Sequence, residues 1–384
     1  MSKTTVGIIG DGQLGMFLCE AAAALNLATV MLTSDRACAA ARCADACVEG
    51  AMDDADAIEA LVNACDVITY EREDIPAPAV TALRAAEKAG RVTCHPSLAV
   101  IELIQDKARQ KRWLAEQKLA TLPFEIVDGS REQLQTAAER LGFPVVQKAL
   151  RGGFDGRGVQ VLNSAEDLAK SWPGTTLLEE FAGDFREIAV LVVRCADGEL
   201  AHFGPVAMTF ETDYSVLDTV TAPAELSPEQ EADAVSLAQR AIGAMDGVGV
   251  FGVEMFLLAD GRLLINEISP RVHNAGHYTM EACRSSQFEQ HLRAVTGQAL
   301  AGTELKAPAA MRNLLCTPAL KREDRHREAG KETSDESTTY WYGKSPARLM
   351  RKLGHITATA NNRDEAIRRV NERWNRIQKE AENA

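Results

Sequence analysis

The chain lacks the features that would place it in a membrane, in an oxidising compartment or on nucleic acid. No uninterrupted apolar stretch approaches the roughly 18 residues needed to span a membrane, and the first apolar run is too short for a signal peptide. The nine cysteines form no C-x-x-C pair and have no histidine at zinc spacing, which favours reduced thiols. A net charge of −13 opposes non-specific binding to nucleic acid. We therefore expect a cytoplasmic protein with no nucleic-acid and no membrane partner.

What the chain does have is enough length and apolar content for several domains. Its 384 residues are 46% hydrophobic, which can bury two or three cores. Over the first hundred residues, short apolar runs alternate with helical stretches, a pattern that predicts a parallel sheet covered on both faces. We expect a long charged helix over 103–118, followed by a strand, a helix and a strand. A last helix over 363–381 has alternating charges, which indicates a solvated face.

Two glycine-rich segments are candidates for anion binding. The first, Gly10–Gly15 (GDGQLG), follows an expected strand and opens a helix, which is the spacing of a dinucleotide fingerprint. Asp35 lies about where an acid that binds the NAD ribose would fall, but the surrounding TSDRACA does not end a strand cleanly and no hydride-handling partner is evident. We favour an anion or sugar-phosphate at this helix N-terminus over a redox cofactor.

The second glycine-rich segment, 152–158 (GGFDGRG), lies between two expected strands and lacks the terminal Lys-Ser/Thr of a Walker loop. Four glycines let the backbone approach phosphate oxygens closely, and Arg157 and Lys148 add positive charge. The segment therefore predicts a hairpin flap that binds phosphate.

The densest group of chemically active residues is the stretch 266–279 (NEISPRVHNAGHYT). Before it, two apolar runs that carry Glu254 and Glu267 are joined by Asp260-Gly261, which predicts a hairpin. Two carboxylates that face each other repel, so an inward pair needs a cation, and carboxylate and phosphate oxygens suit magnesium. The stretch also supplies Arg271 and two histidines, of which we expect His277 to be structural.

These features resemble the ATP-grasp ligases, with a GGFDGRG flap after a lysine-bearing strand, EEFAG before REIAV and two glutamates on core strands. More narrowly, GDGQLG, GGFDGRGVQ, NEISPRVHNAGH, SSQFEQHLRAVTG and YGKSPARLMRKLGHIT resemble the 5-(carboxyamino)imidazole ribonucleotide synthase family. The resemblance implies an α/β architecture with an ATP-grasp fold and a homodimer. It implies a Rossmann-like pre-ATP-grasp domain over 1–102, a lid over 103–182, a core over 183–302 and a small β-rich C-terminal domain over 303–384.

The family resemblance implies that ATP phosphorylates bicarbonate and that the resulting carboxyphosphate carboxylates the exocyclic amine of aminoimidazole ribonucleotide, a step of purine biosynthesis. It assigns Mg²⁺ to Glu254 and Glu267, with Asn266 adjacent. The residues assigned to ATP by the resemblance are Lys107, Lys148, Gly153, Phe154, Asp155, Gly156, Arg157, Gly158, Val159, Glu179, Glu180, Phe181, Ala182, Glu187, Asn266 and Glu267.

The remaining assignments concern the two anions other than ATP. Arg271 suits a bidentate clamp on carboxyphosphate, with His273 and Asn274 donating hydrogen bonds that keep the intermediate from water. The resemblance implies that the ribonucleotide is bound by Gln13, Lys344, Arg351 and Lys352.

The chain departs from the family pattern at a few positions. Glu211 lies in a region where the family has a histidine, Ala275 stands where a serine is usual, Cys316 where a glycine is usual, and Lys107 where an arginine is usual. Three interpretations follow, namely a divergent synthase, a paralogue with another acceptor, or a fold that has lost turnover. An NAD-binding dehydrogenase and a non-catalytic nucleotide sensor are the alternatives from other classes.

Overall fold

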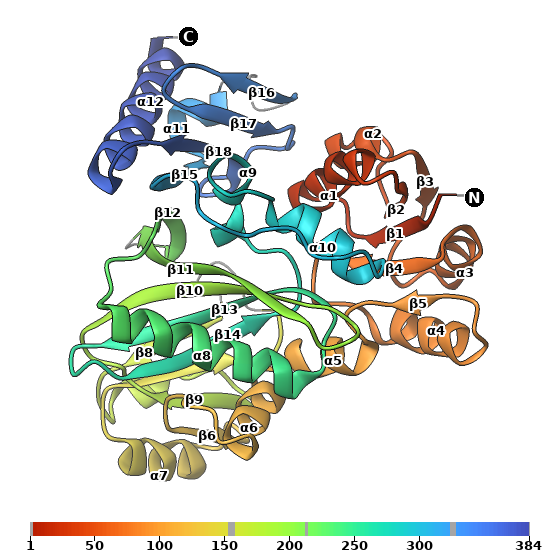
Figure 1. Ribbon diagram of the computed structural model, residues 1–384. Coiled ribbons are helices and arrows are strands. Elements are labelled where there is room, and N and C mark those ends of the chain that lie inside the picture. Colours follow the sequence, from red (N-terminus) through yellow and green to blue (C-terminus); the bar gives the residue numbers. More distant parts are fainter. Residues whose placement is uncertain (1–2, 153–157, 212–213, 323–327, 384) are drawn as a thin grey trace.

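The computed structural model describes residues 3–152, 158–211, 214–322 and 328–383, and its strands form three sheets (Figure 1). The first sheet has the order β3-β2-β1-β4-β5 and is parallel throughout. Its strands are β1 (Thr5–Ile9), β2 (Ala28–Thr33), β3 (Ala46–Glu49), β4 (Val67–Tyr70) and β5 (Thr93–Cys94). Its helices are α1 (Gln13–Ala24), α2 (Ala39–Cys43), α3 (Ala55–Ala64) and α4 (Ala77–Lys88).

This parallel sheet is covered on both faces, as the alternating pattern predicted. The side chain of Ile8 packs in a cluster with residues of α1 and α2, whereas the neighbouring Ile9 packs in a different cluster with residues of α3 and α4. Successive side chains of a strand point to opposite faces, so the two clusters lie on the two sides of the sheet.

The helix predicted over 103–118 is wrong, because two helices occupy this region. Helix α5 (Leu98–Ile104) ends before Asp106, and α6 (Lys107–Glu116) begins after it. The carboxylate of Asp106 accepts hydrogen bonds from the amides of Ala108 and Arg109, so the residue caps a new helix with an extended backbone. The break makes Lys107 the first residue of α6.

The second sheet has four strands in the order β6-β9-β7-β8. They are β6 (Phe124–Val127), β7 (Val145–Ala149), β8 (Val159–Leu162) and β9 (Thr176–Glu180), and the associated helices are α7 (Arg131–Leu141) and the short η1 (Asp167–Lys170). The strand, helix and strand expected here are confirmed. Strands β7 and β8 pair antiparallel on either side of the glycine-rich segment, with Lys148 opposite Val159, while residues 153–157 lie outside the described part.

The third sheet has nine strands in the order β14-β13-β10-β11-β12-β15-β18-β17-β16. They are β10 (Phe185–Arg194), β11 (Leu200–Glu211), β12 (Val216–Ala222), β13 (Gly249–Leu258), β14 (Leu263–Ser269), β15 (Ala309–Leu315), β16 (Ala329–Thr333), β17 (Thr338–Tyr342) and β18 (Lys352–Thr359). The helices that follow the chain are α8 (Pro228–Met245), η2 (Asn274–Gly276), α9 (Thr279–Ala282), α10 (Gln287–Val295), α11 (Pro318–Arg322) and α12 (Arg363–Asn383). Because β12 pairs with β15, one sheet includes strands from both sides of residue 302, where the core was expected to end and the C-terminal domain to begin.

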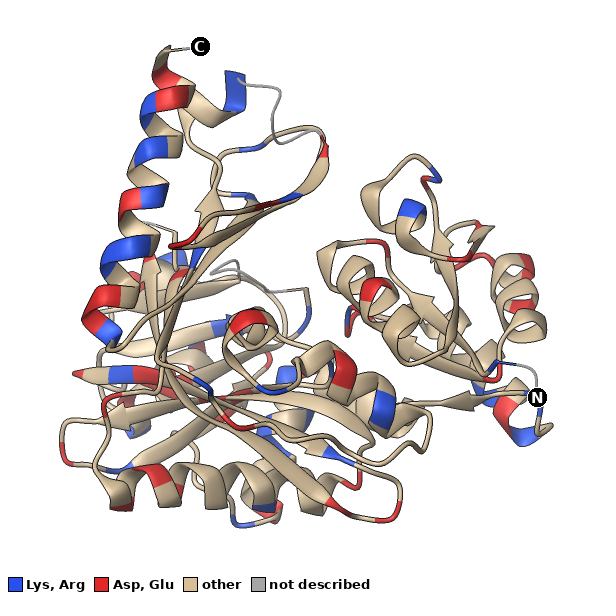
Figure 2. Ribbon diagram, turned by 45° about the horizontal axis from the view of Figure 1, so that its top comes forward, with Lys and Arg blue, Asp and Glu red and all other residues tan. Residues whose placement is uncertain are grey.

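Helix α12 is only partly the solvated helix that its charges predicted. Residues Ala366, Val370, Ile377 and Ala381 are buried in a cluster with β15 and β18, and charges of both signs line the rest of the helix (Figure 2). One face therefore holds the C-terminal strands. None of the described helices is both long and apolar enough to cross a membrane.

Candidate active site

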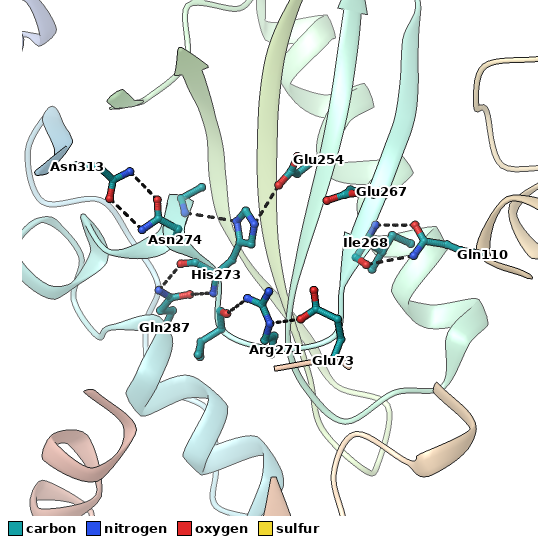
Figure 3. Close-up of polar contacts among 12 residues, drawn as sticks. Glu73, Gln110, Glu254, Glu267, Ile268, Arg271, His273, Asn274, Gln287 and Asn313 are labelled. Atoms are coloured by element: carbon teal, nitrogen blue, oxygen red, sulfur yellow. Dashed lines mark hydrogen bonds and ion pairs between the residues drawn. The ribbon is translucent and has the colours of Figure 1, made fainter. Parts of the chain in front are cut away.

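The hairpin of β13 and β14 places two carboxylates directly opposite each other. Glu254 on β13 pairs in register with Glu267 on β14, and the backbone reverses at Gly261, so the predicted hairpin is confirmed. The ammonium of Lys107 forms an ion pair with Glu267. The Nε2 atom of His273 lies 3.0 Å from Oε1 of Glu254 (Figure 3). Each carboxylate thus has a basic side chain as a polar partner.

The charge of Glu267 is stabilised by its surroundings. Burial by itself raises the pKa of this carboxyl group, but the positive charges of Lys107 and then Lys148 outweigh burial and lower the pKa to about 2. The group is therefore a carboxylate at neutral pH. Two such oxygen donors, held across one strand pair, are the ligand type that a hard divalent cation takes, so the site fits Mg²⁺.

A buried carboxylate connects two lysines beside this pair. Glu179, at the end of β9, is fully buried, and its two oxygens lie 2.6 Å from Nζ of Lys111 and 2.5 Å from Nζ of Lys148. Lys148 also donates a 3.0 Å hydrogen bond to Oδ1 of Asn266. Glu179 was expected to bind ATP, and its carboxylate lies between these two cations.

Lys111 is a site residue that the sequence analysis missed. It is 3% exposed, and burial, partly offset by Glu179, lowers its pKa to about 8. The signal was available, because Lys111 follows Lys107 by one helical turn and therefore lies on the same face of α6.

The other described residues assigned to the nucleotide lie on or next to strands β8, β9 and β10. Phe181 and Val159 are exposed large apolar side chains, whereas Glu187 is on β10 between Phe256 of β13 and Met208 of β11. Burial, with the charge of Glu254 second, raises the pKa of Glu187 to about 8. Glu180 is the last residue of β9, Ala182 lies between β9 and β10, and Gly158 precedes β8. Gly153, Phe154, Asp155, Gly156 and Arg157 lie outside the described part.

Arg271 joins the core to the first sheet. Its Nε atom lies 2.5 Å from Oε2 of Glu73, and its Nη1 donates to the carbonyl of Val272 at 3.1 Å. Burial by itself raises the pKa of the Glu73 carboxyl group, but the charge and hydrogen bond of Arg271 outweigh burial, and the pKa is lowered. Glu73 was missed, although it closely follows β4 at the carboxyl edge of a parallel sheet, where binding residues gather.

The two residues after Val272 are held by partners within the protein. The Nδ1 atom of His273 accepts a hydrogen bond from the amide of Ala275 at 3.4 Å, so Nε2 bears the hydrogen and donates a hydrogen bond to Oε1 of Glu254. The side-chain amide of Asn274 exchanges two hydrogen bonds with that of Asn313, at 3.1 and 2.7 Å. The side chains expected to bind carboxyphosphate therefore have protein partners in this structure.

The expectation for His277 agrees with its environment. The residue is fully buried, and its ring stacks on that of His355 with centroids 4.8 Å apart. Burial, followed by the neighbouring His355 and by further basic side chains that include Lys352 and Lys344, lowers the pKa of His277 well below its usual value. A neutral buried ring suits a structural part.

The first glycine-rich segment holds a carboxyl group that belongs to the protein. The amide of Gly15 donates to Oε2 of Glu71 at 2.8 Å, and a Cβ atom added at Gly10, where φ is +119°, would lie 2.3 Å from the Glu71 side chain. Asp35 instead accepts a hydrogen bond from the amide of Ala37 within its own loop. These contacts give the N-terminus of α1 an internal partner.

The residues assigned to the ribonucleotide come from both ends of the chain. Nζ of Lys344 donates to Oε1 of Gln13 at 2.5 Å, so the structure brings these two together. Arg351 donates through Nη1 to the carbonyl of Pro346, in the turn between β17 and β18, and Lys352 begins β18. Lys344 thus links the segment after β17 to the start of α1.

Family models match three consecutive parts of the chain. They are the ribonucleotide synthetase preATP-grasp domain over residues 3–105, the ATP-grasp domain over 112–288 and the phosphoribosylaminoimidazole carboxylase C-terminal domain over 309–369. The N5-carboxyaminoimidazole ribonucleotide synthase of Brucella melitensis is 38% identical over 360 residues, which cover 92% of this chain and 96% of the relative. This chain belongs to the N5-carboxyaminoimidazole ribonucleotide synthase family.

Other members support the same family assignment. The synthase of Synechococcus elongatus is 39% identical over 92% of this chain and 88% of its own length. The crystal structure of the synthase from Aspergillus clavatus in complex with ADP and 5-aminoimidazole ribonucleotide matches with a TM-score of 0.85 at 32% identity, over 99% of each chain. The ATP-grasp fold with an N-terminal pre-ATP-grasp domain is confirmed, and the chain is an ATP-dependent ligase.

The departures from the synthase family pattern have visible surroundings. Met208 lies opposite Glu187 in the sheet, and Glu211 ends the same strand, β11. Ala275 is fully buried and donates its amide to His273. The backbone of Cys316 bonds to the carbonyl of Arg351 and to the amide of Met350, so this position supports the basic turn.

Proposed function

We propose that this synthase uses Mg²⁺ and ATP to phosphorylate bicarbonate and transfers the carboxyl group of the resulting carboxyphosphate to the exocyclic amine of 5-aminoimidazole ribonucleotide. The observation that carries the proposal is the carboxylate pair Glu254 and Glu267, flanked by Lys107 and Lys148 and followed directly by the segment with Arg271. Phosphoryl transfer needs aligned cations more than it needs a covalent nucleophile, and this arrangement supplies them.

The nucleotide half of the proposal follows from the charges. Glu254 and Glu267 would hold the metal, which supplies charge neutralisation on the β- and γ-phosphates when bound. Lys107 and Lys148 would exchange their present partners for phosphate oxygens. We assign the segment from Gly153 to Val159 to the phosphates, and Glu179, Glu180, Phe181, Ala182, Glu187 and Asn266 to the rest of the nucleotide site.

The second half concerns the reactive anion. A bicarbonate oxygen forms a bond to the γ-phosphorus as the bond to ADP breaks, and the substrate amine then attacks the carboxyl carbon as phosphate leaves and the nitrogen loses a proton. Arg271, with His273 and Asn274, would retain carboxyphosphate between these steps. Charge-assisted hydrogen bonds from a guanidinium suit such an anion.

The acceptor would lie between the first sheet and the basic turn before β18. Gln13 and Lys344 already contact each other there, and Arg351 and Lys352 add charge for the ribonucleotide phosphate. A homodimer and a cytoplasmic location stay predictions. The molecular mass measured by sedimentation in an analytical ultracentrifuge tests the first, and cell fractionation tests the second.

The deciding experiment measures phosphate release from Mg·ATP and bicarbonate, with and without aminoimidazole ribonucleotide, together with detection of the carboxylated product. We expect the acceptor to stimulate release and product to form in equal amount. Nucleotide turnover with no acceptor stimulation would reject this acceptor and favour a paralogue with another one.

The dehydrogenase alternative is tested separately by thermal unfolding with nucleotides. A ligand that binds the native state raises the melting temperature. We expect stabilisation by Mg·ATP and none by NAD, and the reverse result would reject the ligase. Binding of ATP without turnover, whatever the acceptor, would favour the sensor.

A further inference from the structure

A buried glutamine holds the backbone on which the proposed anion clamp stands. Gln287, the first residue of α10, is fully buried. Its Oε1 atom accepts from the amide of His273 at 2.8 Å, and its Nε2 atom donates to the carbonyl of His273 at 2.7 Å (Figure 3). One side chain thus satisfies both backbone groups of one residue, as a neighbouring strand would.

The contact with Gln287 lies where the backbone has no strand partner, because His273 follows the end of β14. Strand β14 ends at Ser269, and residues 270–273 precede the short helix η2. Buried backbone groups outside a ladder need other partners, and here Gln287 supplies them. The orientation of His273 therefore depends on a residue 14 positions further along the chain.

The ring of His273 is fixed by two further contacts. A Cβ atom added at Gly252 would lie 2.7 Å from Cγ of His273, so β13 forms a floor directly under the ring. At its edge, Nε2 contacts Glu254. Gln287 thus fixes the backbone of His273, while Gly252 and Glu254 fix the position of its ring.

We propose that Gln287 is a positioning residue that sets the bicarbonate and carboxyphosphate site by fixing the backbone of His273. The inference rests on the proposed function, since the affected substrate is the anion of that reaction. It requires no contact between Gln287 and any substrate, because the side chain acts through the backbone of His273.

The same helix provides a matched control. Gln290 is also fully buried, and it holds Ala301 in the same way, with its Oε1 accepting from the amide at 3.0 Å and its Nε2 donating to the carbonyl at 2.5 Å. Ala301 lies beyond α10, in the stretch that leads to β15. Replacing either glutamine by methionine removes such a pair of hydrogen bonds while nearly keeping the side-chain volume, and at Gln287 it also removes a 3.5 Å contact with Nδ1 of His277.

The test compares Gln287→Met with Gln290→Met in the full-length protein, with wild type as reference. We expect Gln287→Met to raise the KM for bicarbonate by about 10-fold or more and to release more phosphate than carboxylated product, since outer groups that orient a site residue contribute about this much. The KM for ATP should stay within about 2-fold. Gln290→Met should keep both the bicarbonate KM and the ratio of phosphate to product.

A second variant guards against loss of folding. Gln287→Glu keeps an oxygen that accepts from the His273 amide but sets a second oxygen, in place of the donor, against the His273 carbonyl, so it should also raise the KM for bicarbonate more than that for ATP and release more phosphate than product. If wild type makes no product, the proposed function fails, and the inference with it. If wild type is active and both Gln287 variants match Gln290→Met in bicarbonate KM and in coupling, the inference alone is wrong.

Discussion

The hairpin of β13 and β14 and the segment 270–278 both contribute to the proposed site, but their side chains are held in different ways. In the hairpin, the strand ladder satisfies the backbone and sets Glu254 opposite Glu267. In the segment, side-chain amides from elsewhere in the chain do this work, with Gln287 on the backbone of His273 and Asn313 on the side chain of Asn274. The placement of the carboxylates is thus local, whereas that of the anion clamp depends on distant residues.

The largest effect should come from the hairpin itself. Glu267→Gln removes the charge that pairs with Lys107 and that would hold the metal, so we expect a loss of turnover of about 1000-fold or more. The fold should remain, because the ladder does not use this side chain. Steady-state kinetics and circular dichroism check both parts. Activity near wild type would refute the role of this carboxylate in metal binding.

The segment should respond through stability as well as through activity. Asn313→Asp can still accept from Nδ2 of Asn274, but it loses the donors to Oδ1 of Asn274 and to the carbonyl of Leu217, which lie 2.7 and 2.8 Å away. Each unsatisfied buried partner costs about 1–3 kcal/mol of unfolding free energy. Urea denaturation should show the loss, and the KM for bicarbonate should rise. If Asn313→Asp lost stability while the KM stayed unchanged, the amide pair would be structural alone.

A third test asks whether the hairpin also depends on a distant residue where β13 begins. The Nδ1 atom of His291 accepts a hydrogen bond from the amide of Val250 (3.0 Å). Its Nε2 atom therefore bears the hydrogen and donates a hydrogen bond to Oγ1 of Thr69 on β4 (2.7 Å). Both contacts need the neutral ring, and burial lowers the pKa of His291 to about 3. The unfolded chain, with a histidine pKa of about 6.5, binds the proton first as pH falls.

Stability should therefore decline as pH falls from about 6.5 towards 3, with this residue adding up to about 1.4 kcal/mol per pH unit. Urea denaturation at several pH values checks the slope. His291→Gln should show a shallower decline, although the buried His277 and His355 leave part of it. Equal slopes in variant and wild type would show that His291 does not keep its proton affinity low in the folded state.

The smallest effect should come from a residue outside both regions. Lys352→Ala removes one cation from the proposed ribonucleotide site, and a charged hydrogen bond at a partly exposed position should change the acceptor KM by about 10-fold at most. The KM values for ATP and bicarbonate should not move. An effect confined to ATP would place Lys352 outside the acceptor site.

The same difference explains what the sequence could predict. The carboxylate hairpin and the strands on either side of the glycine-rich segment follow from alternation and turn residues, which act over a few positions. Two partners of the anion clamp, Gln287 and Asn313, could not be found this way, since each lies in a distant element and nothing in its local pattern indicates its contact. Glu73 had a signal in its place after β4, but that place does not name Arg271 as its partner. The helix break at Asp106 was missed because helical charge pattern was given more weight than a capping residue.

The family resemblance added what local patterns could not, because it assigned residues at both ends of the chain to one site. Gln13 and Lys344, which are in contact, are the best example. It did not reveal which protein groups hold these residues. Lys111 shows the limit, since it shares a carboxylate with Lys148 and yet has no place among the implied ligands.

The carboxyl group of Glu71 at the start of α1 changes what the pattern GDGQLG means. At Gly10 and Gly12 a Cβ atom would come within 2.3 Å of this one side chain, and the amide of Gly15 donates to it. The glycines therefore leave space for the side chain of Glu71, and a dinucleotide could bind here only by displacing that side chain. A chain can thus have the glycine spacing of a cofactor-binding fingerprint while these glycines pack against and bind one of its own acidic side chains.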